Sequence, residues 1–397
     1  MSSGKVTLRA VFRIALFYGF AGFGGGYSVL AQLRRDLVER RNWVSGEDFL
    51  VLAELSKTLP GTPATSLLAL LGQRVGGVRG GALAAGAFLL PSMVLMIVCG
   101  AAYSSVRRVA GLSLFFDGMN AAMVGVVGAV TVDLGRAALR SWRHVAIALL
   151  CGLLLATRVV SEPILAAAAV AIGTMRGILK GPPVAPRQPP GEPEKANTEP
   201  PRSERLHGPV PFAVIPLVLA GSLVTLAELV RVFVPIGVMT FGGGLAMIPA
   251  IEHTVVVEQR WLDPKAFADA IALGQVTPGP VAICSTFIGY QVGGVAGAIV
   301  ATLAMFVPAT ALALAAGHSL ERFRQSAIVV EILRSLAPAV IGMLGAATFS
   351  LGRAALSVHV DALLAGAAFV ILLRRPISPL WLLTAGGLIR LAMSMAS

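Results

Sequence analysis

Charged residues are scarce in this 397-residue sequence, where they make up only 13% of the chain. A soluble globular protein has roughly a quarter charged residues, so this chain cannot cover a water-facing surface. Hydrophobic residues make up 56% of it, and the mean hydropathy is +0.81. Apolar segments of about 15 to 25 residues follow one another, which is typical of membrane helices and not of barrel strands. The predicted fold class is therefore an all-α polytopic membrane protein.

Cysteine is also rare, and motifs for catalysis are missing. Cys99, Cys151 and Cys284 lie in separate apolar segments with no paired spacing, so the sequence predicts neither a disulfide framework nor a metal site. It contains no Gly-x-x-x-x-Gly-Lys-Ser/Thr motif for ATP and no Gly-x-Ser-x-Gly motif for a nucleophile. We accordingly expect no enzyme activity, no catalytic residues, no metal and no cofactor.

Acidic residues are outnumbered by basic ones, 20 to 32, which gives a net charge of +12. In a soluble protein such an excess would suggest a nucleic-acid partner. Here most of the arginines lie in short loops between apolar segments, where basic residues set the membrane topology. We therefore expect the lipid bilayer as a partner and no nucleic acid.

A glycine-rich run and its copy organise the whole chain. Phe23-Gly24-Gly25-Gly26 returns 218 positions later as Phe241-Gly242-Gly243-Gly244, and Pro60-Gly61 returns as Pro278-Gly279. The hexapeptide at 134–139 returns unchanged at 351–356. Chance does not produce so many matches at a nearly constant shift, so one structural unit is used twice.

We predict two homologous six-helix repeats with broken helices, separated by a polar segment. The segment is rich in proline, which predicts a disordered linker. An apolar stretch after it has no counterpart in the first repeat, and one extra membrane helix there would invert the second repeat and give about 12–13 membrane helices. The predicted divisions are repeat 1 at 1–180, the linker at 181–209, the extra helix at 210–228 and repeat 2 at 229–397.

Loop charges favour the inverted arrangement. Residues 8–31 and 49–73 are expected to be the first two membrane spans, the second of them broken at Pro60-Gly61. With the N-terminus in the cytoplasm, only the extra helix leaves most basic loop residues of repeat 2 on the cytoplasmic side. The loops at Trp43 and Trp261 then lie on opposite sides of the membrane. If the extra stretch lies flat on the membrane instead, the repeats are parallel.

Inverted repeats with helices broken by glycine and proline are typical of secondary transporters. A break inside the membrane exposes backbone N–H groups and the positive end of a half-helix. Protein, water or a ligand must satisfy those groups, and anions do so at many helix N-termini. The recurrence of both breaks favours a site for a small anion, with close helix packing and plain kinks as the alternatives.

The predicted substrate-binding residues lie at the breaks or within one helical turn of them. Lys57 stands three positions before Pro60, where its side chain either faces an anion or extends to the membrane surface. The substrate-binding candidates are Gly24, Gly25, Gly26, Lys57, Thr58, Pro60, Gly61, Gly242, Gly243, Gly244, Gln275, Thr277, Pro278, Gly279 and Pro280. The candidates for charge pairing or ion coupling, with a helix-end position as the alternative, are Arg13, Arg231, Glu54 and Asp269.

As a group, the motifs resemble those of the chromate transporter family. Repeat 2 carries them most fully, as Phe241-Gly242-Gly243-Gly244, Arg260-Trp261-Leu262, Gln275-Val276-Thr277-Pro278-Gly279-Pro280 and Gly289-Tyr290-Gln291. Repeat 1 departs from the pattern at Thr62 and Asn42. The resemblance implies a secondary transporter in the bacterial inner membrane that exports chromate, a small oxyanion, and thereby gives chromate resistance.

The resemblance also implies coupling to an ion gradient, for which the proton is a candidate. The sequence leaves open whether the protein forms a homodimer. Two other hypotheses are a secondary transporter of another small anion such as sulfate, and a membrane scaffold whose proline-rich linker docks a partner.

Overall fold

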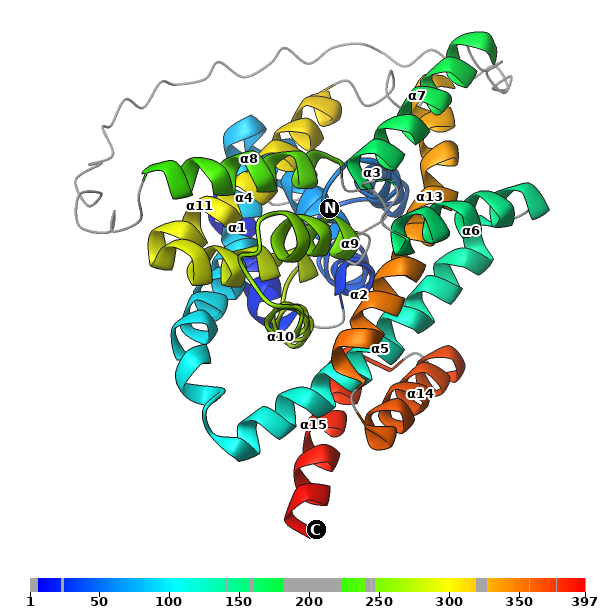
Figure 1. Cartoon of the computed structure of the whole chain (residues 1–397). Helices are drawn as coiled ribbons and strands as arrows, with labels where there is room; N and C mark the ends of the chain where they lie inside the picture. The colour runs from blue at the N-terminus through cyan, green and yellow to red at the C-terminus, as the bar shows by residue number, and fades with distance from the viewer. Residues whose placement is uncertain are drawn as a thin grey trace, which may run out of the picture.

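The described part of the chain is all-helical in a computed structural model (Figure 1). The structure describes residues 6–22, 25–139, 141–157, 160, 162–180, 223–239, 244, 247–318, 327–356, 358–375 and 377–396. No β-strand occurs within these ranges, which confirms the all-α class. The predicted linker at 181–209 and most of the predicted extra helix at 210–228 lie outside the described residues.

The two repeats contain matching series of helices. Those of repeat 1 are α1 (Leu8–Ala21), α2 (Gly25–Arg34), the π-helical turn η1 (Arg35–Arg40), α3 (Gly46–Thr58), α4 (Pro63–Val106), α5 (Ala110–Ala138), α6 (Trp142–Ala156) and α7 (Glu162–Lys180). Those of repeat 2 are α8 (Leu223–Met239), α9 (Ile248–Glu252), η2 (His253–Glu258), α10 (Pro264–Val276), η3 (Val281–Ile283), α11 (Cys284–His318), α13 (Ala327–Ala355), α14 (His359–Arg374) and α15 (Pro379–Ala396).

Small details of the backbone repeat together with the sequence. The Ser45 side chain caps α3 by accepting a hydrogen bond from the Asp48 N–H, and Asp263 caps α10 at the equivalent position. Asn42 and Arg260, which precede these caps, both adopt a positive φ, of 51° and 53°. A π-helical turn comes before each of them. The duplication predicted from sequence is thus confirmed in the structure.

The two longest helices, α4 and α11, are each folded at a pair of glycines. Gly77 in α4 and Gly294 in α11 have φ of 61° and 62°, a region that favours glycine. The fold brings Gly72 so close to Gly80 that a Cβ on Gly72 would lie 2.4 Å from the Gly80 carbonyl oxygen. Each helix is therefore a hairpin, with a short arm before the glycine pair and a long arm after it.

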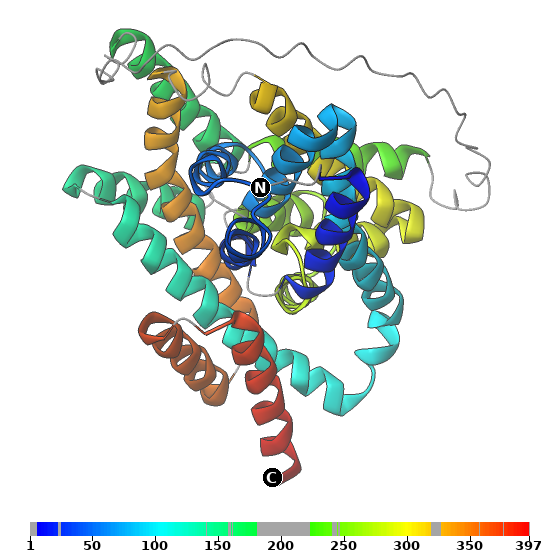
Figure 2. The same cartoon turned by 180° about the vertical axis from the view of Figure 1, so that it is seen from behind.

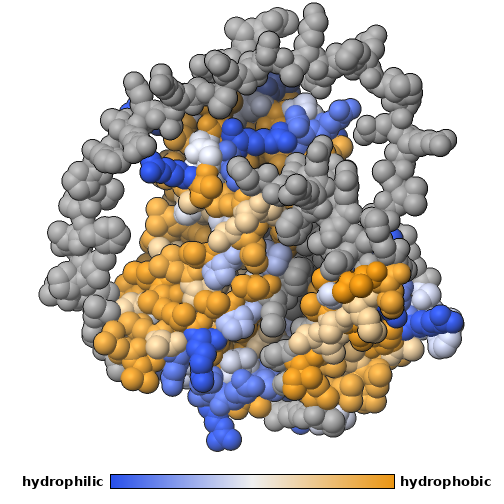
Figure 3. All heavy atoms as spheres, turned by 90° about the horizontal axis from the view of Figure 1, so that it is seen from above, coloured by the Kyte–Doolittle hydropathy of each residue, from blue (hydrophilic) through white to orange (hydrophobic). Residues whose placement is uncertain are grey.

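Four helices in the described part of the chain, α4, α5, α11 and α13, are long and apolar enough to cross a membrane. In the space-filling view, apolar side chains cover broad areas of the visible face (Figure 3). A surface of this kind is stable against lipid and not against water. The structure thus agrees with the membrane location inferred from composition.

The path of residues 49–73 differs from the predicted membrane span. Asp48, at the start of α3, forms an ion pair with Arg74, at the end of the short arm of α4, with 2.9 Å between Oδ1 and Nη1. Both ends of this stretch therefore lie on one side of the membrane, called the Arg74 side below. The prediction of a crossing span was wrong because the chain reverses at Pro60-Gly61 and returns. α3 and the short arm of α4 form a re-entrant pair.

Residues 8–31 do not form a crossing span either. Val6, before α1, and Trp43, after η1, line the same cavity, and Arg74 lines it too. α1 and α2 therefore make a second re-entrant pair that opens toward the Arg74 side. Several segments counted among the expected 12–13 membrane helices are thus half-length helices whose tips meet inside the protein.

The long arms of α4 and α11 run in opposite directions. Gln73 Nε2, at the end of the first short arm, donates a hydrogen bond to Leu314 O on the second long arm, at 2.8 Å. The equivalent Gln291 Nε2 donates to Gly100 O on the first long arm, at 3.0 Å. Each long arm therefore ends beside the start of the other, which confirms the inversion of repeat 2. The side on which the α4 long arm ends is called the Arg107 side.

Inversion predicts that Arg40 and Glu258, which are equivalent and exposed, lie on opposite sides of the membrane. We expect Arg40→Cys and Glu258→Cys, each in a chain whose three native cysteines are replaced, to differ in labelling by a membrane-impermeant maleimide. In intact cells one of them should react, and the other should react only after permeabilisation. Labelling of both from the same side would contradict the inverted arrangement.

The helices form two bodies. The core body consists of the re-entrant pairs and hairpins of both repeats, α1–α4 and α8–α11, which pack together. The frame body consists of α5–α7 and α13–α15. In it the repeats exchange helices, because α6 and α7 pack on α13 whereas α14 and α15 pack on α5 (Figures 1 and 2).

Candidate functional site

The tips of the re-entrant pairs meet inside the core body. The Gly279 N–H donates a hydrogen bond to Gly22 O, at 3.0 Å, which joins a break of repeat 2 to a break of repeat 1. Gly279 also lies against Ser92, on the long arm of α4, and Gly61 lies against the equivalent Ala309, on the long arm of α11. We call the contact between Gly22 and Gly279 the break junction.

Glycine is required at both proline-glycine breaks. Gly61 and Gly279 have φ of 97° and 109°, which is beyond the range that residues with a Cβ adopt readily. A Cβ would also lie 2.7 Å from Ala309 Cβ at the first break and 2.8 Å from Ser92 Oγ at the second. Backbone conformation and close approach therefore both explain why proline-glycine occurs twice in the sequence.

Two helices begin within three residues of a break. α2 begins at Gly25 and Gly26, and α4 begins at Pro63. Thr62, the residue before α4, makes no capping bond, because its hydroxyl donates to Thr65 Oγ1 at 2.8 Å instead. First-turn N–H groups have no acceptor within their own helix, and the helix dipole adds positive potential there. This arrangement favours an anion.

Two buried side chains beside the second break have polar atoms without a partner. Gln275 is 7% exposed, and its Nε2 donates to no atom, while Ser285 is fully buried and its Oγ makes no hydrogen bond. Thr277 differs, because its hydroxyl already donates to Leu273 O at 2.7 Å. Leaving a buried donor unpaired costs roughly 1–3 kcal/mol. An oxyanion between these groups would satisfy them.

The structure shows contacts for several of the predicted break residues. Gly61 packs against Ala309, Gly279 contacts Gly22 and Ser92, and Gly244 lies beside Val281, where a Cβ would be 3.1 Å from Val281 Cβ. The predicted site residues outside the described part are Gly24, Gly242 and Gly243, together with the side chain of Thr58.

The predicted basic residues do not reach the junction. Lys57 Nζ forms an ion pair with Glu54 Oε1 at 2.8 Å, and the two side chains are 35% and 67% exposed. Arg13 and Arg231 are exposed on the outer faces of α1 and α8. An anion near the breaks would therefore be held by helix ends and amide groups, and not by these side chains.

Asp269 lies at the centre of a buried polar cluster between the core body and the frame body. Its carboxylate accepts hydrogen bonds from Tyr103 Oη at 2.5 Å and Asn120 Nδ2 at 2.6 Å, and Arg107 Nη2 lies 2.8 Å away. Asp269 itself is fully buried. α10, α4 and α5 are thus held together at one carboxylate, which we call the Asp269 cluster.

A second acid extends this cluster toward the membrane surface. Asp117 on α5 pairs with Arg107 at 3.4 Å and with Lys265 on α10 at 2.9 Å. Sequence reasoning singled out Asp269 but missed Tyr103, Arg107 and Asn120. The available signal was an asparagine inside an apolar helix, which is costly without a partner.

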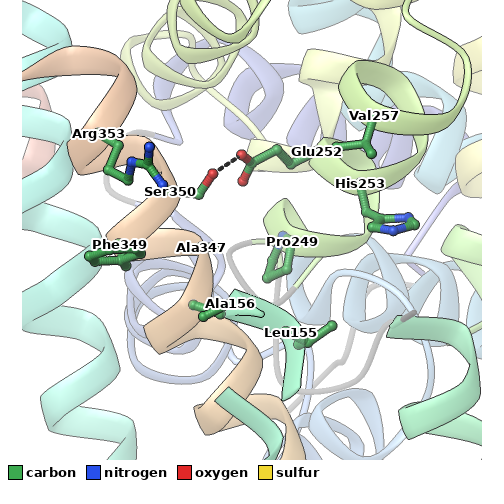
Figure 4. Close-up of a pocket in the computed structure, with 11 residues that line it drawn as sticks. Leu155, Ala156, Pro249, Glu252, His253, Val257, Ala347, Phe349, Ser350 and Arg353 are labelled. Carbon is green, nitrogen blue, oxygen red and sulfur yellow. Dashed lines mark hydrogen bonds between the residues drawn. The ribbon is translucent and has the colours of Figure 1, made fainter. Parts of the chain in front are cut away.

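A cavity of about 100 Å³ remains between the two bodies on the Arg107 side (Figure 4). Glu252 and His253 line it from the core body, and Ser350 and Arg353 line it from α13. Ser350 Oγ donates a hydrogen bond to the Glu252 carboxylate across the interface, as the dashed line shows. The cavity holds both charge signs, which suits a dianion less well than a site lined by donors alone.

Comparison with known proteins gives one consistent family. A family model described as "Chromate transporter" matches residues 9–174 and again 227–391. A probable chromate transport protein of Synechococcus elongatus is 30% identical over 88% of this chain and 86% of its own length. Chromate transport proteins of Cupriavidus metallidurans and Pseudomonas aeruginosa are 29% and 28% identical, over 93% and 94% of this chain and 88% and 89% of their own lengths. No solved structure matches.

Proposed function

The chain belongs to the chromate transporter family, and we propose that it exports chromate by secondary active transport across a bacterial inner membrane, which gives chromate resistance. The observation that supports this most directly is the break junction. It joins the two repeats through the Gly279–Gly22 hydrogen bond. α2 begins three residues after Gly22, and the unpaired Gln275 amide and Ser285 hydroxyl lie within six residues of Gly279 along the chain.

Chromate suits these groups chemically. It is a tetrahedral dianion with four acceptor oxygens and no donor, so it needs several N–H or O–H groups at once. Donor groups that are already fixed in place bind such an ion at little cost in reorganisation. A hydrophobic or acidic cavity would exclude it.

Energy for export is available without ATP. Moving one elementary charge through 100 mV is worth about 2.3 kcal/mol, and a dianion doubles that figure. An inside-negative potential therefore favours the outward movement of chromate. We place the additional ion coupling at the Asp269 cluster, because Asp269 is a fully buried carboxylate at the interface between the two bodies.

Chromate uptake into inverted membrane vesicles tests the function. Vesicles that contain the protein should accumulate chromate faster than vesicles without it, and dissipation of the proton gradient should lower the rate. A sulfate competitor series measures selectivity between the two dianions. Equal uptake with and without the protein would remove chromate as the substrate.

Two substitutions test the site. We expect Gln275→Leu, and separately Ser285→Ala, to raise the KM for chromate roughly ten- to hundredfold, since one hydrogen bond to a charged group contributes about 1.5–3 kcal/mol and about 1.4 kcal/mol is a factor of ten. Gln73→Leu is the matched control, because the Gln73 amide donates to the Leu314 backbone and does not lie at the junction. It should lower stability more than affinity. An unchanged KM in both site variants would place the substrate elsewhere.

A further inference from the structure

Equivalent helices of the two repeats differ in exposure. One face of α3 is exposed: Leu50 is 49% exposed, and the Glu54 side chain is 67% exposed. The equivalent residues of α10, Ala268 and Ala272, are 3% and 0% exposed. Lys57 and its counterpart Gln275 continue the same faces. Two copies of one unit thus occupy two different environments.

Packing between the bodies explains the difference. α10 packs against α5, α13 and α15 of the frame body, whereas α3 packs on α2 and α4 within the core body. In the duplication, α3 corresponds to α10, α5 to α13, and α7 to α15. The contacts of α10 therefore predict contacts of α3 with α13, α5 and α7, but among the described residues α3 makes no comparable contact with these helices. The core body is therefore closed against the frame on the Arg107 side and open on the Arg74 side.

A second contact between the bodies shows the same asymmetry. The Ser350 hydroxyl donates to Glu252 and links α9 to α13 on the closed side. The equivalent residues in repeat 1 are Arg34 on α2 and Asp133 on α5. They are opposite in charge and not joined to each other. Arg34 is exposed, and Asp133 is 57% exposed and only 3.8 Å from the neighbouring Arg136.

We propose that this structure is one of two alternating states, and that in the other state Arg34 and Asp133 form an ion pair that closes the Arg74 side. In that state the α3 face at Leu50 and Glu54 is buried against the frame. The α10 face at Ala268 and Ala272 is exposed, and the contacts of the Asp269 cluster and of Glu252 with Ser350 are broken. Arg34 and Asp133 are positioning residues: their ion pair would block the path from the Arg74 side to the break junction.

The physical basis is the inverted duplication. Two copies with the same local sequence preferences can exchange conformations at a small difference in free energy, since each state satisfies one copy of the interface. Substrate at the break junction then faces one side of the membrane at a time. This inference rests on the proposed transport function, but it concerns geometry that can be measured without any substrate.

Cross-linking between matched cysteine pairs tests the exchange. The pairs are Arg34→Cys with Asp133→Cys, and Glu252→Cys with Ser350→Cys, in the full chain without its native cysteines. With a short bis-methanethiosulfonate reagent, we expect the second pair to cross-link in most molecules and the first in few. Asn120→Ala removes a contact to Asp269 on the closed side, so it should raise the yield of the first pair at least tenfold and lower that of the second.

The same variants define what would overturn the proposal. Cross-links of both pairs in single molecules that carry all four cysteines would show that the two contacts are not alternatives. A first pair that stays unlinked in the Asn120→Ala background while the second pair loses its link would also refute it. Loss of chromate transport with a retained exchange of cross-links would instead count against the substrate alone.

Water accessibility gives an independent measurement. Leu50→Cys should react with a water-soluble maleimide at least tenfold faster than Ala268→Cys. Asn120→Ala should slow the reaction of Leu50→Cys and speed that of Ala268→Cys, so that the ratio of the two rates falls. Glu54→Cys and Ala272→Cys form a second matched pair if the first accumulates poorly. If neither Leu50→Cys nor Glu54→Cys reacts, this face of α3 contacts lipid. The inference that the core body is open to water on the Arg74 side would then be wrong.

Discussion

Replacement of Gly279 with alanine is expected to lower chromate transport at least a hundredfold while the protein still accumulates in the membrane. Gly279 has a φ of 109°, and a Cβ there would lie 2.8 Å from Ser92 Oγ. Holding a residue with a Cβ in such a conformation costs on the order of 1–3 kcal/mol. Displacement of the loop by about 1 Å would move the donors of the junction, and errors of that size cost about a hundredfold in positioned reactions.

The rate of chromate uptake into vesicles, divided by the amount of protein from quantitative blotting, measures this effect. Gly86→Ala is the matched control, since Gly86 lies in α4 with no atom within 4 Å of an added Cβ. The double variant Gly279→Ala with Ser92→Gly removes the close contact but not the backbone strain, so it should recover part of the rate. Normal transport by Gly279→Ala would show that the break does not position substrate.

Replacement of Arg107 with glutamine is expected to destabilise the protein by about 3–5 kcal/mol, because a buried carboxylate then loses its cationic partner. Asp269 is fully buried, and Arg107 is 17% exposed. Thermal unfolding in detergent, followed by the fraction of protein that stays monodisperse, measures the loss. The midpoint should fall by several degrees or more.

A double-mutant cycle separates the ion pair from general damage. Asp269→Asn in the Arg107→Gln background removes the unpaired charge, so it should restore most of the lost stability. Arg136→Gln is the control, because it breaks an ion pair whose side chains are 67% and 57% exposed. Such pairs contribute about 0–1 kcal/mol. Equal effects of Arg107→Gln and Arg136→Gln would mean that the Asp269 cluster is not a stabilising interface.

Local sequence signals were sufficient for the repeat and for the positions of the breaks. The identical spacing of Pro60-Gly61 and Pro278-Gly279 predicted two matched interruptions, and the structure shows positive φ at both glycines. Loop charge predicted that repeat 2 is inverted, which the antiparallel long arms confirm. These features depend on composition, on the backbone preference of glycine and on the preference of basic loop residues for the cytoplasmic side. All three act on short segments of the chain.

The path of the chain between the breaks was not accessible to the same reasoning. An apolar segment with a break can continue across the membrane or turn back, and residues 49–73 turn back so that Asp48 meets Arg74. Hydropathy is the same in both cases. The re-entrant path is seen only in the tertiary structure, where Gly61 packs against Ala309 of the other repeat.

The partners of Asp269 also depended on distant parts of the chain. Arg107 had the sequence pattern of a loop residue that sets topology, yet it pairs with a carboxylate 162 positions away in the sequence. Local composition and spacing were enough to predict a duplicated, inverted helical membrane protein with matched breaks. Tertiary structure alone decided that the breaks meet, that Asp269 is enclosed, and that α3 is exposed where α10 is buried. Two copies of one unit share their local preferences, so only the packing of the core body against the frame body distinguishes them.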